Sequence, residues 1–600
     1  MNNDKKVRIG CASAFWGDTS TAAKQLVEKG DLDYLVFDFL AEVTMSILAS
    51  AKMKDPKMGY ATDFIRQVTP LLPMIKEDGI KILSNAGGIN PIACRDILKD
   101  SADKAGIELS IAIVTGDDLI SELPRLKDLE ITEMESDQSI PGSCLSINAY
   151  LGAPGIVQAL GKGADIVITG RCVDSALVLA PLMHEFNWKD SDYDLLASGS
   201  LAGHIIECGA QCTGGNFTDW KEVEGFHDMG FPIVEVEKNG DFVVSKPNDT
   251  GGMVSFGTVA EQFLYEIGNP AQYLLPDVVC DFTQVSIKDI GKDKVRVSGA
   301  SGSAPTDQYK VSATYMNGYR VAGTLVIGGR DAKEKGNRIA NAIIKKVSGL
   351  LTEYDLGPFN RTSYDLLGTD SIYGPDHSKS ESREIVLRLM ATHVKKEALI
   401  ILSREMAQAA TGMAAGVINY LGGRPPVSQS IHLFSFLLSK DQITVETHLN
   451  NEITSIKIAT GGGYVQKKDN RRSSSNSIIG KQKTVSVPLS KLAFARSGDK
   501  GDHANIGVIS RKPEYLPYIQ KALSSDLVAN YFSHVLDGEV LSWDVPGING
   551  INFLLKNALG GGGMASLNVD PQGKSYAQQL LEYEIPIDDE LFANLKVEYE

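Results

Sequence analysis

The chain has 600 residues, of which 43% are hydrophobic, and it carries a formal net charge of -16 at pH 7. Hydrophobic cores stop growing at roughly 250–300 residues, so a chain of this length is expected to divide into at least two domains. The hydrophobic content excludes a largely disordered protein. The acidic balance argues against a nucleic-acid partner, because a phosphate backbone requires a basic footprint.

The start of the chain, MNNDKKVRIG, has neither the apolar core of a signal peptide nor the character of a transit peptide. Its most apolar stretches are shorter than the ~20 apolar residues that a membrane helix requires. All seven cysteines lie in the first half of the chain, mostly beside apolar residues, which is typical of a reducing compartment. We expect a cytoplasmic protein with no membrane partner. The expected partners are a small-molecule substrate and further copies of the chain in a homo-oligomer.

From residue 6 to about 210, short β-rich runs alternate with helical patterns. Examples are VRIGCAS before TAAKQLVEKG, and GADIVITG before DSALVLAPLMHEF. This alternation predicts βαβ units, which form a mostly parallel sheet with helices on both faces. Continuous apolar runs such as IAIV and DIVIT are typical of strands buried on both sides. The first part of the chain is therefore predicted to have an α/β fold.

A β-rich pattern follows between about 230 and 330, and the Met-Asn-Gly sequence at 316–318 predicts a hairpin turn there. We interpret residues 1–460 as one large α/β unit with a β-rich lobe. Residues 461–484 combine Gly, Ser, Asn and basic side chains with almost no apolar ones, so a flexible linker is predicted. Residues 485–600 are predicted to form a small α+β domain.

Polar residues follow several of the predicted strands. In an open α/β sheet, ligands bind outside the carboxyl ends of the strands, so these positions are candidates for substrate binding. Each could also be an ordinary loop cap, but together they would meet at one edge of the sheet. The candidates are Asp18, Asp38, Asn85, Gly87, Gly88, Arg171 and Asp174.

The segment SNAGGINP contains the paired glycines Gly87 and Gly88, which allow a ligand to approach the backbone closely. Asn90 and Pro91 can begin a helix, whose N-terminal amides favour an anion such as a phosphate or a carboxylate. Neither GxGxxG nor GxxxxGK[ST] occurs in the chain, so it has no nucleotide fingerprint and its cofactor stays unknown.

The segment LAGHIIECGAQCTGGNF holds the candidate catalytic residues. A helix predicted over 196–210 would place His204, Glu207 and Cys208 side by side. Three interpretations remain open: these side chains satisfy buried loops, they form an acid–base pair, or they bind a metal. A metal site would need a second ligand cluster such as CxxC, which the sequence does not contain, so no metal is assigned. Cys208 or Cys212 could also act as a nucleophile.

The segment RSGDKGDHANIG, near residue 500, is the second dense polar cluster. Turn chemistry alone explains its Gly-Asp pairs. The other interpretation is a loop that faces the cleft of the large domain, in which backbone amides and basic side chains hold an anion. Its candidate substrate-binding residues are Ser497, Asp499, Lys500 and Asn505.

Four long motifs give the chain a recognisable resemblance: ITGRCVDSALVLAPL, LAGHIIECGAQCTGGNF, PNDTGGMVSFGTVAEQFLYEIGNPAQYLLPDVVCDF and SGDKGDHANIG. They resemble the acyclic terpene utilisation (AtuA) family, long described as a domain of unknown function. The resemblance implies an AtuA-like main domain to about residue 460 and a ferredoxin-like domain over 485–595. Bacterial genes of the family lie with those for citronellol and geraniol breakdown through CoA thioesters. This implies acyl-CoA or branched-acid catabolism, and transfers no catalytic residue.

We therefore expect an enzyme that acts on a CoA thioester or a branched carboxylic acid by hydrolysis, hydration or C–C cleavage. Arg171 would hold a carboxylate, and His204 and Glu207 would exchange protons. The alternative is a non-catalytic binding or assembly subunit of an acyl-CoA catabolic complex, in which the polar clusters only hold the domains together.

Overall fold

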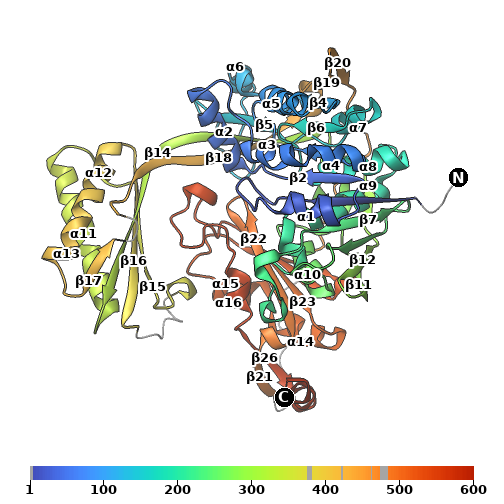
Figure 1. The fold of residues 1–600 in the computed structure, drawn as a ribbon. Helices are drawn as coiled ribbons and strands as arrows, with labels where there is room; N and C mark the ends of the chain where they lie inside the picture. Colours follow the sequence, from blue (N-terminus) through green and yellow to red (C-terminus); the bar gives the residue numbers. More distant parts are fainter. Residues whose placement is uncertain (1–4, 375–381, 421–422, 461, 473–483, 600) are drawn as a thin grey trace.

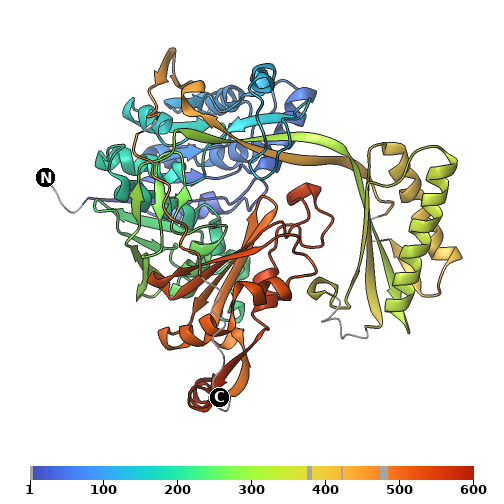
Figure 2. The same ribbon diagram turned by 180° about the vertical axis from the view of Figure 1, so that it is seen from behind.

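The structure, a computed structural model, describes residues 5–374, 382–420, 423–460, 462–472 and 484–599. The chain forms a central α/β body, an arm that projects from it, and a small C-terminal domain between the two (Figures 1 and 2).

Parallel strands form the centre of the body's main sheet, as the sequence predicted. Their order is β1, β2, β3, β6, β4, and all four pairings among them are parallel. Antiparallel strands extend the sheet at both edges. The parallel strands are β1 (Lys6–Cys11), β2 (Tyr34–Phe37), β3 (Lys81–Ser84), β4 (Ile111–Thr115) and β6 (Ile166–Thr169); the antiparallel ones are β7 (Ile233–Glu237), β8 (Phe242–Ser245), β11 (Ser286–Gly291), β12 (Lys294–Ser298), β19 (Val445–Leu449) and β20 (Glu452–Ile456).

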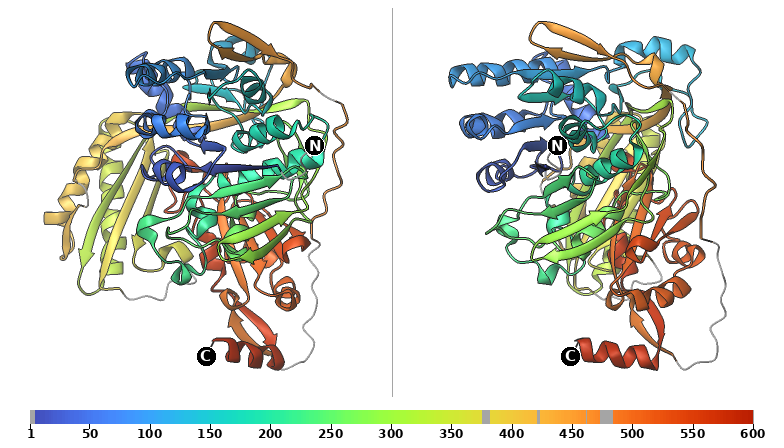
Figure 3. Two further views of the ribbon diagram at one scale, coloured as in Figure 1. Left: turned by 45° about the vertical axis from the view of Figure 1, so that its right-hand side comes forward. Right: turned by 90° about the vertical axis from the view of Figure 1, so that its right-hand side faces the viewer.

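The parallel strands β2, β3, β4 and β6 are buried on both sides, because their successive side chains enter different cores. In β2, Leu35 and Phe37 join one hydrophobic cluster, whereas Tyr34 and Val36 join the other. The blue helices α1–α5 cover the first face and α6–α9 the second (Figure 3). These helices are α1 (Ala22–Lys29), α2 (Glu42–Lys54), α3 (Thr62–Val68), α4 (Leu72–Asp78), α5 (Pro91–Lys104), α6 (Leu123–Asp128), α7 (Pro154–Gly161), α8 (Ala176–Phe186) and α9 (Tyr193–Ile206).

The predicted hairpin at 316–318 is wrong, because β14 (Gln308–Gly328) runs through it as one strand. Its pairing with β18 (Val427–Ser439) shifts between Met316 and Tyr319, where β14 has one extra residue. Gly318 has a φ of 77° at this bulge. The Asn-Gly sequence therefore bends a long strand instead of reversing it, since β18 continues alongside it on both sides of the bulge.

The outer half of β14 leads into the arm, where helices cover one face of a second sheet (Figure 1). The arm has a hydrophobic cluster of its own, which includes Leu325, Ile343, Leu387 and Leu402. Its elements are β15 (Arg361–Leu367), β16 (Glu384–His393), β17 (Val417–Tyr420), α11 (Ala332–Glu353), α12 (Lys396–Glu405) and α13 (Ala409–Gly412); β5 (Ser146–Ala149) pairs with β14 at the body end.

The C-terminal domain is a four-stranded antiparallel sheet, β22-β23-β25-β24, packed with short helices. Ile509, Val545 and Ile548 of this domain belong to the hydrophobic cluster of the body, so the two share one continuous core. Its elements are β21 (Thr484–Pro488), β22 (Ala493–Lys500), β23 (His503–Ser510), β24 (Val540–Val545), β25 (Gly550–Leu555), β26 (Glu584–Asp588), α14 (Leu516–Ala522), α15 (Ser525–Tyr531), α16 (Tyr576–Leu580) and α17 (Asp589–Tyr599).

Of the predicted linker, 461–484, the structure describes 462–472 and Thr484, which begins β21; its other residues lie outside the described part of the chain. Residues 462–472 form no helix or strand and run along the outside of the body toward the C-terminal domain (Figure 3). Arg472 donates to the carbonyls of Leu523 and Gln520, and Trp543 donates to Asp469 over 2.8 Å. This half of the segment is therefore docked, because polar contacts replace the apolar ones that it lacks.

None of the helices within the described ranges has the length and apolar character to cross a membrane. All seven cysteines are free thiols, and none is paired with another.

Candidate functional site

Asp38 and Asn85 meet at the carboxyl ends of β2 and β3, as the sequence predicted. The Asn85 side-chain amide donates to Asp38 Oδ1 over 2.7 Å and accepts from the backbone of Phe39. Burial raises the pKa of Asp38 well above its usual range, and the nearby Asp174 carboxylate raises it further. Asp38 therefore lies in the same group of charges as the residues after β6.

Arg171 and Asp174 follow β6 and form an ion pair with each other. The Arg171 guanidinium lies over the ring of Tyr150, 4.2 Å from its centroid, and its Nε is buried without a partner among the described residues. Glu42, at the start of α2, belongs to this group. Burial would raise the pKa of Glu42, but the charges of Lys310 and Arg171 outweigh burial and lower it to about 2.

The α9 helix ends at Ile206, four residues before the predicted end, and Gly209 has a φ of 56°. His204 and Glu207 nevertheless lie together, with His204 Nδ1 3.0 Å from Glu207 Oε1. His204 Nε2 lies 3.2 Å from the carbonyl of Phe263. A carbonyl only accepts, so Nε2 carries the hydrogen in the neutral ring. Nδ1 is then an acceptor, and only a protonated Glu207 can donate to it.

The pKa shifts of this pair agree with that assignment. Burial lowers the pKa of His204 to about 4, so its ring is neutral at pH 7. Burial raises the pKa of Glu207 well above its usual range, and the carboxylates of Asp174 and Glu266 add to the effect. His204 is 2% exposed, whereas the Glu207 side chain is 14% exposed. Glu207 is therefore the more exposed member of the pair and the one that carries the shared proton.

The environment of the two candidate thiols disfavours their ionised form. Burial raises the pKa of both Cys208 and Cys212 above the usual value for a thiol, and the carboxyls of Glu207 and Glu266 raise that of Cys208 further. The reactive form of a cysteine is the thiolate, which these environments disfavour. Their packing as small apolar side chains fits the structure better than a nucleophilic role.

The segment RSGDKGDHANIG is not a long loop but the hairpin of β22 and β23, turned by Gly501 and Asp502. Ser497 is buried and donates to the carbonyl of Gly573, so it holds its own domain together. Asp499 and Lys500 are the last two residues of β22, next to the turn, and neither is buried. The segment forms strands because β23 pairs with β22 on one side and with β25 on the other. The many polar residues in the segment had predicted a loop instead.

Lys500 brings the C-terminal domain to the residues of the body. Its Nζ lies over the ring of Tyr273, 5.2 Å from the centroid, and the Tyr273 ring lies 5.9 Å from that of His204. Lys500 is close enough to Glu207 and Glu266 to lower the pKa of both carboxyls, in opposition to burial. We call this group of ionisable side chains the interdomain cluster. Its members are Asp38, Glu42, Arg171, Asp174, His204, Glu207, Glu266, Lys310, Asp499, Lys500 and Lys574.

Glu266, which follows α10 (Phe256–Leu264), belongs to the cluster although no pattern in the sequence pointed to it. It has a φ of 60°, a left-handed conformation that is costly for a residue with a side chain. Asn505 holds it there, because its Oδ1 accepts from the Glu266 backbone over 2.8 Å while its amide donates to the carbonyl of Leu264. Asn505 therefore positions a carboxyl of the body from the C-terminal domain.

Asp117 was also missed, although it follows β4 and obeys the same strand-end rule as Asp38. It accepts from the Arg171 backbone over 2.8 Å and from the Asn148 side chain over 2.9 Å. Burial raises its pKa to about 7. Applying the rule to every predicted strand would have found it.

Other predicted residues have structural contacts instead. A Cβ at Gly87 would lie 2.5 Å from the carbonyl of Thr169, and one at Gly88 2.4 Å from the Leu48 side chain. The close approach that these glycines allow is thus to the protein itself. Asp18 accepts from the backbones of Ala14 and Thr19 and caps its own loop.

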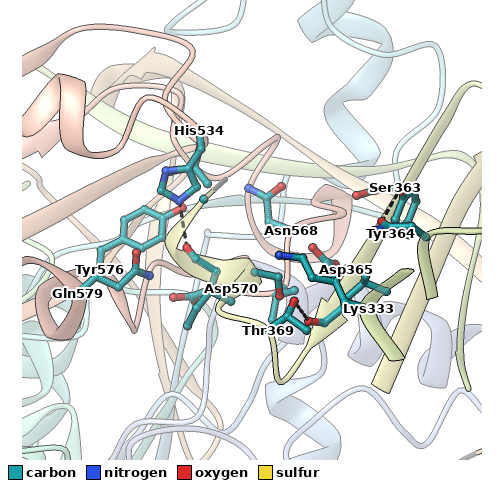
Figure 4. A pocket seen from close by; sticks show the side chains of 17 residues that line it. Lys333, Ser363, Tyr364, Asp365, Thr369, His534, Asn568, Asp570, Tyr576 and Gln579 are labelled. Carbon is teal, nitrogen blue, oxygen red and sulfur yellow. Dashed lines mark hydrogen bonds between the residues drawn. The ribbon is translucent and has the colours of Figure 1, made fainter. Parts of the chain in front are cut away.

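A cavity of about 470 Å³ lies between the arm and the C-terminal domain, and no member of the interdomain cluster lines it. Lys333, Tyr364 and Asp365 of the arm face His534 and Asp570 across it (Figure 4). None of the predicted site residues lines it. His534 Nε2 lies 3.0 Å from the carbonyl of Ile372, so this side of the cavity joins the C-terminal domain to the arm.

No group of three or more His, Cys, Asp or Glu side chains could hold a metal ion within the described ranges. His204, Glu207 and Cys208 are therefore not arranged as a metal site.

The model of the acyclic terpene utilisation family protein AtuA matches residues 7–449, close to three quarters of the chain. The chain belongs to the acyclic terpene utilisation family. The model of the AtuA ferredoxin-like domain matches residues 487–586, which contain the whole of the β22–β25 sheet. The family predicted from the motifs is thus confirmed, as is the α/β fold followed by a ferredoxin-like domain. Neither a curated protein nor a solved structure matches this AtuA-family chain.

Proposed function

We propose that this AtuA-family protein is an enzyme that transfers protons on a branched carboxylic acid or its CoA thioester. Glu207 is the general acid, and His204 is the positioning residue that holds its carboxyl. The observation that carries the proposal is the bond between the neutral His204 ring and a Glu207 carboxyl that retains its proton. A carboxyl with a raised pKa is the usual general acid at neutral pH.

The surroundings of Glu207 favour hydration or C–C cleavage over hydrolysis through a thioester of the enzyme. Both reactions need a proton donor and a base, and several carboxyls with different environments lie around Glu207. Glu42 is held ionised by its cationic neighbours, whereas Glu207 is held protonated. Two carboxyls in opposite states are the arrangement that acid–base catalysis requires.

Membership of the family relates the protein to terpene utilisation. We propose in addition that its substrate is a branched acyl compound. The test is to incubate the protein with saturated, 2-enoyl, 3-hydroxy and 3-oxo branched acyl-CoAs and the corresponding acids, and to follow products by mass spectrometry. We expect turnover of at least one class. Glu207→Gln should lower kcat by about 10²–10⁴-fold. The melting temperature should stay within a few degrees, because the Gln amide can still donate to His204 Nδ1.

The alternative, a non-catalytic binding or assembly subunit, is favoured by the ion pairs within the cluster. The charge of Arg171 is neutralised by Asp174 in the same loop. The charge of Lys310 is neutralised by Glu42. Thermal stabilisation by an acyl-CoA without turnover of any compound, unchanged in Glu207→Gln, would support this alternative and contradict the enzyme.

A further inference from the structure

One cation of the interdomain cluster differs from the other three. Each of the three has a carboxylate partner, whereas Lys500 forms no ion pair or side-chain hydrogen bond with any residue that the structure describes. The three pairs are Lys310 with Glu42 at 3.6 Å, Lys574 with Asp499 at 3.5 Å, and Arg171 with Asp174. An amine without a carboxylate at its nitrogen is the one that can lose its proton most readily.

The position of Lys500 is built by the fold rather than by a mobile loop. It is the last residue of β22, and the carbonyl and amide of this strand pair with His503 across a two-residue turn. The stem directs Nζ over the face of Tyr273, whose ring in turn lies beside His204. Lys500 keeps exposed surface at which a ligand can approach it, while the side chains around its nitrogen withdraw that atom from bulk water.

We propose that Lys500 forms an imine with a carbonyl group of the substrate, so that the substrate class is a ketone or a 3-oxo acid derivative. This deepens the proposed function and rests on it for the role of Glu207. A lysine acts in this way when its amine is neutral and close to an acid that can remove water.

The chemistry balances with the residues of the cluster. The Lys500 nitrogen attacks the carbonyl carbon, a C–N bond forms, and one proton moves from nitrogen to the carbonyl oxygen. The Glu207 carboxyl then gives its proton to the hydroxyl of this carbinolamine, the C–O bond breaks, and water leaves. The product is a protonated imine beside the Glu207 carboxylate, with no change in oxidation state. The positive imine nitrogen accepts electrons when a neighbouring C–C bond breaks.

Some of the charges that face Lys500 lower its pKa, and others raise it. Burial and the neighbouring ammonium of Lys310 lower the pKa of Lys500, whereas the carboxylates of Glu266 and Glu42, and that of Glu207 once it has given up its proton, oppose them. The net direction is downward, which favours the neutral amine. The groups that face Lys500 come from β14, α2, the end of α9, the end of α10 and the short strand β9 (Tyr273–Leu274): they are Lys310, Glu42, Glu207, Glu266 and Tyr273.

Borohydride trapping tests the inference without requiring turnover. The full chain is incubated at neutral pH with acetoacetate, acetone or 3-methylbutanal and sodium cyanoborohydride, and the peptides are mapped by mass spectrometry. We expect one adduct at Lys500, formed about tenfold faster than at Lys310, which has a carboxylate partner in the same cluster. The adduct should disappear in Lys500→Arg, which keeps the charge, and persist in Lys310→Arg.

Equal labelling of Lys500 and Lys310, or an adduct that survives in Lys500→Arg, overturns the inference. A second measurement, competitive acetylation of the wild-type lysines across pH, does not depend on any variant folding. It contradicts the inference if Lys500 reacts no faster than the exposed lysines. Failure of trapping while Glu207→Gln still abolishes turnover removes the imine and leaves the proposed function in place.

Discussion

Glu266 has an unfavourable backbone at a point where its carboxyl faces the interdomain cluster. Its φ of 60° costs about 1–2 kcal/mol for a residue with a Cβ. Such strain persists where the surrounding contacts impose it, and here Asn505 does so. A residue whose conformation costs stability is a candidate for function.

Replacing Glu266 should change the stability and the turnover of the protein in opposite directions. Glu266→Gly should raise the free energy of unfolding by about 1 kcal/mol, because glycine adopts positive φ without penalty. The turnover of the proposed reaction should fall. Chemical denaturation and the acyl-CoA panel measure the two effects.

Glu130 is the matched control, since it has a φ of 51° but is exposed and belongs to no part of the cluster. Glu130→Gly should stabilise the protein by a similar amount and leave turnover unchanged. If Glu266→Gly destabilises the protein, the strain has been assigned to the wrong residue.

Asp117 makes the stability of the folded protein depend on pH. Its pKa rises from 3.8 unfolded to about 7 in the fold because of burial. The folded state thus keeps a proton that the unfolded state has lost. The contribution of Asp117 is therefore fully present below pH 4, falls as the pH rises, and is lost above pH 7.

Asp117→Asn should remove this dependence while its Oδ1 still accepts from Arg171 and Asn148. The variant should gain stability relative to the wild type as the pH rises from 4 to 8, by on the order of 4 kcal/mol at most. Urea unfolding at several pH values measures the difference. A difference that stays constant across this range contradicts the assigned pKa.

At the level of elements, the bulge in β14 decides where the arm points. Without Gly318 the strand would need a side chain at a φ of 77°, and that Cβ would lie 2.7 Å from the carbonyl of His393. Gly318→Ala should therefore cost about 1–3 kcal/mol. Hydrogen exchange should rise in the arm and stay unchanged in the parallel strands of the body.

Gly349 offers the opposite case within the arm. It lies inside α11, and an added Cβ would meet nothing within 4 Å. Gly349→Ala should stabilise the arm by about 0.5–1 kcal/mol, because alanine is the better helix former. If Gly318→Ala and Gly349→Ala changed the free energy of unfolding by the same amount, Gly318 would carry no strain at the bulge.

For the whole molecule, the central question is whether the C-terminal domain is an independent unit. Its residues Ile509, Val545 and Ile548 complete the core of the body. Arg511 forms a two-pronged pair with Asp219, at 2.5 and 2.6 Å. These contacts make the interface part of the folded core rather than a surface contact.

A fragment ending at residue 460 should therefore expose apolar surface, lose stability and lose ligand binding, because Lys500 and Asn505 are absent. Co-expression with residues 484–600 should restore a soluble complex. Size-exclusion chromatography and thermal unfolding measure both. A truncated protein that stays soluble, binds and turns over like the full chain would make the C-terminal domain a docking or oligomerisation module.

The sequence by itself determined the family and the ferredoxin-like domain, because its long motifs resemble those of the family, and it determined the α/β class of the body, because periodicity is a local signal. It also offered Asp38 and Arg171 as candidates from strand ends, and Glu207 and Lys500 as candidates from dense polar segments. Only the tertiary structure decided which of these residues meet. Glu266 and Lys310 are separated from Glu207 by long stretches of chain, and no local pattern encodes that contact. The division of roles within the His204–Glu207 pair likewise depends on burial and on the carbonyl of Phe263, which only packing supplies.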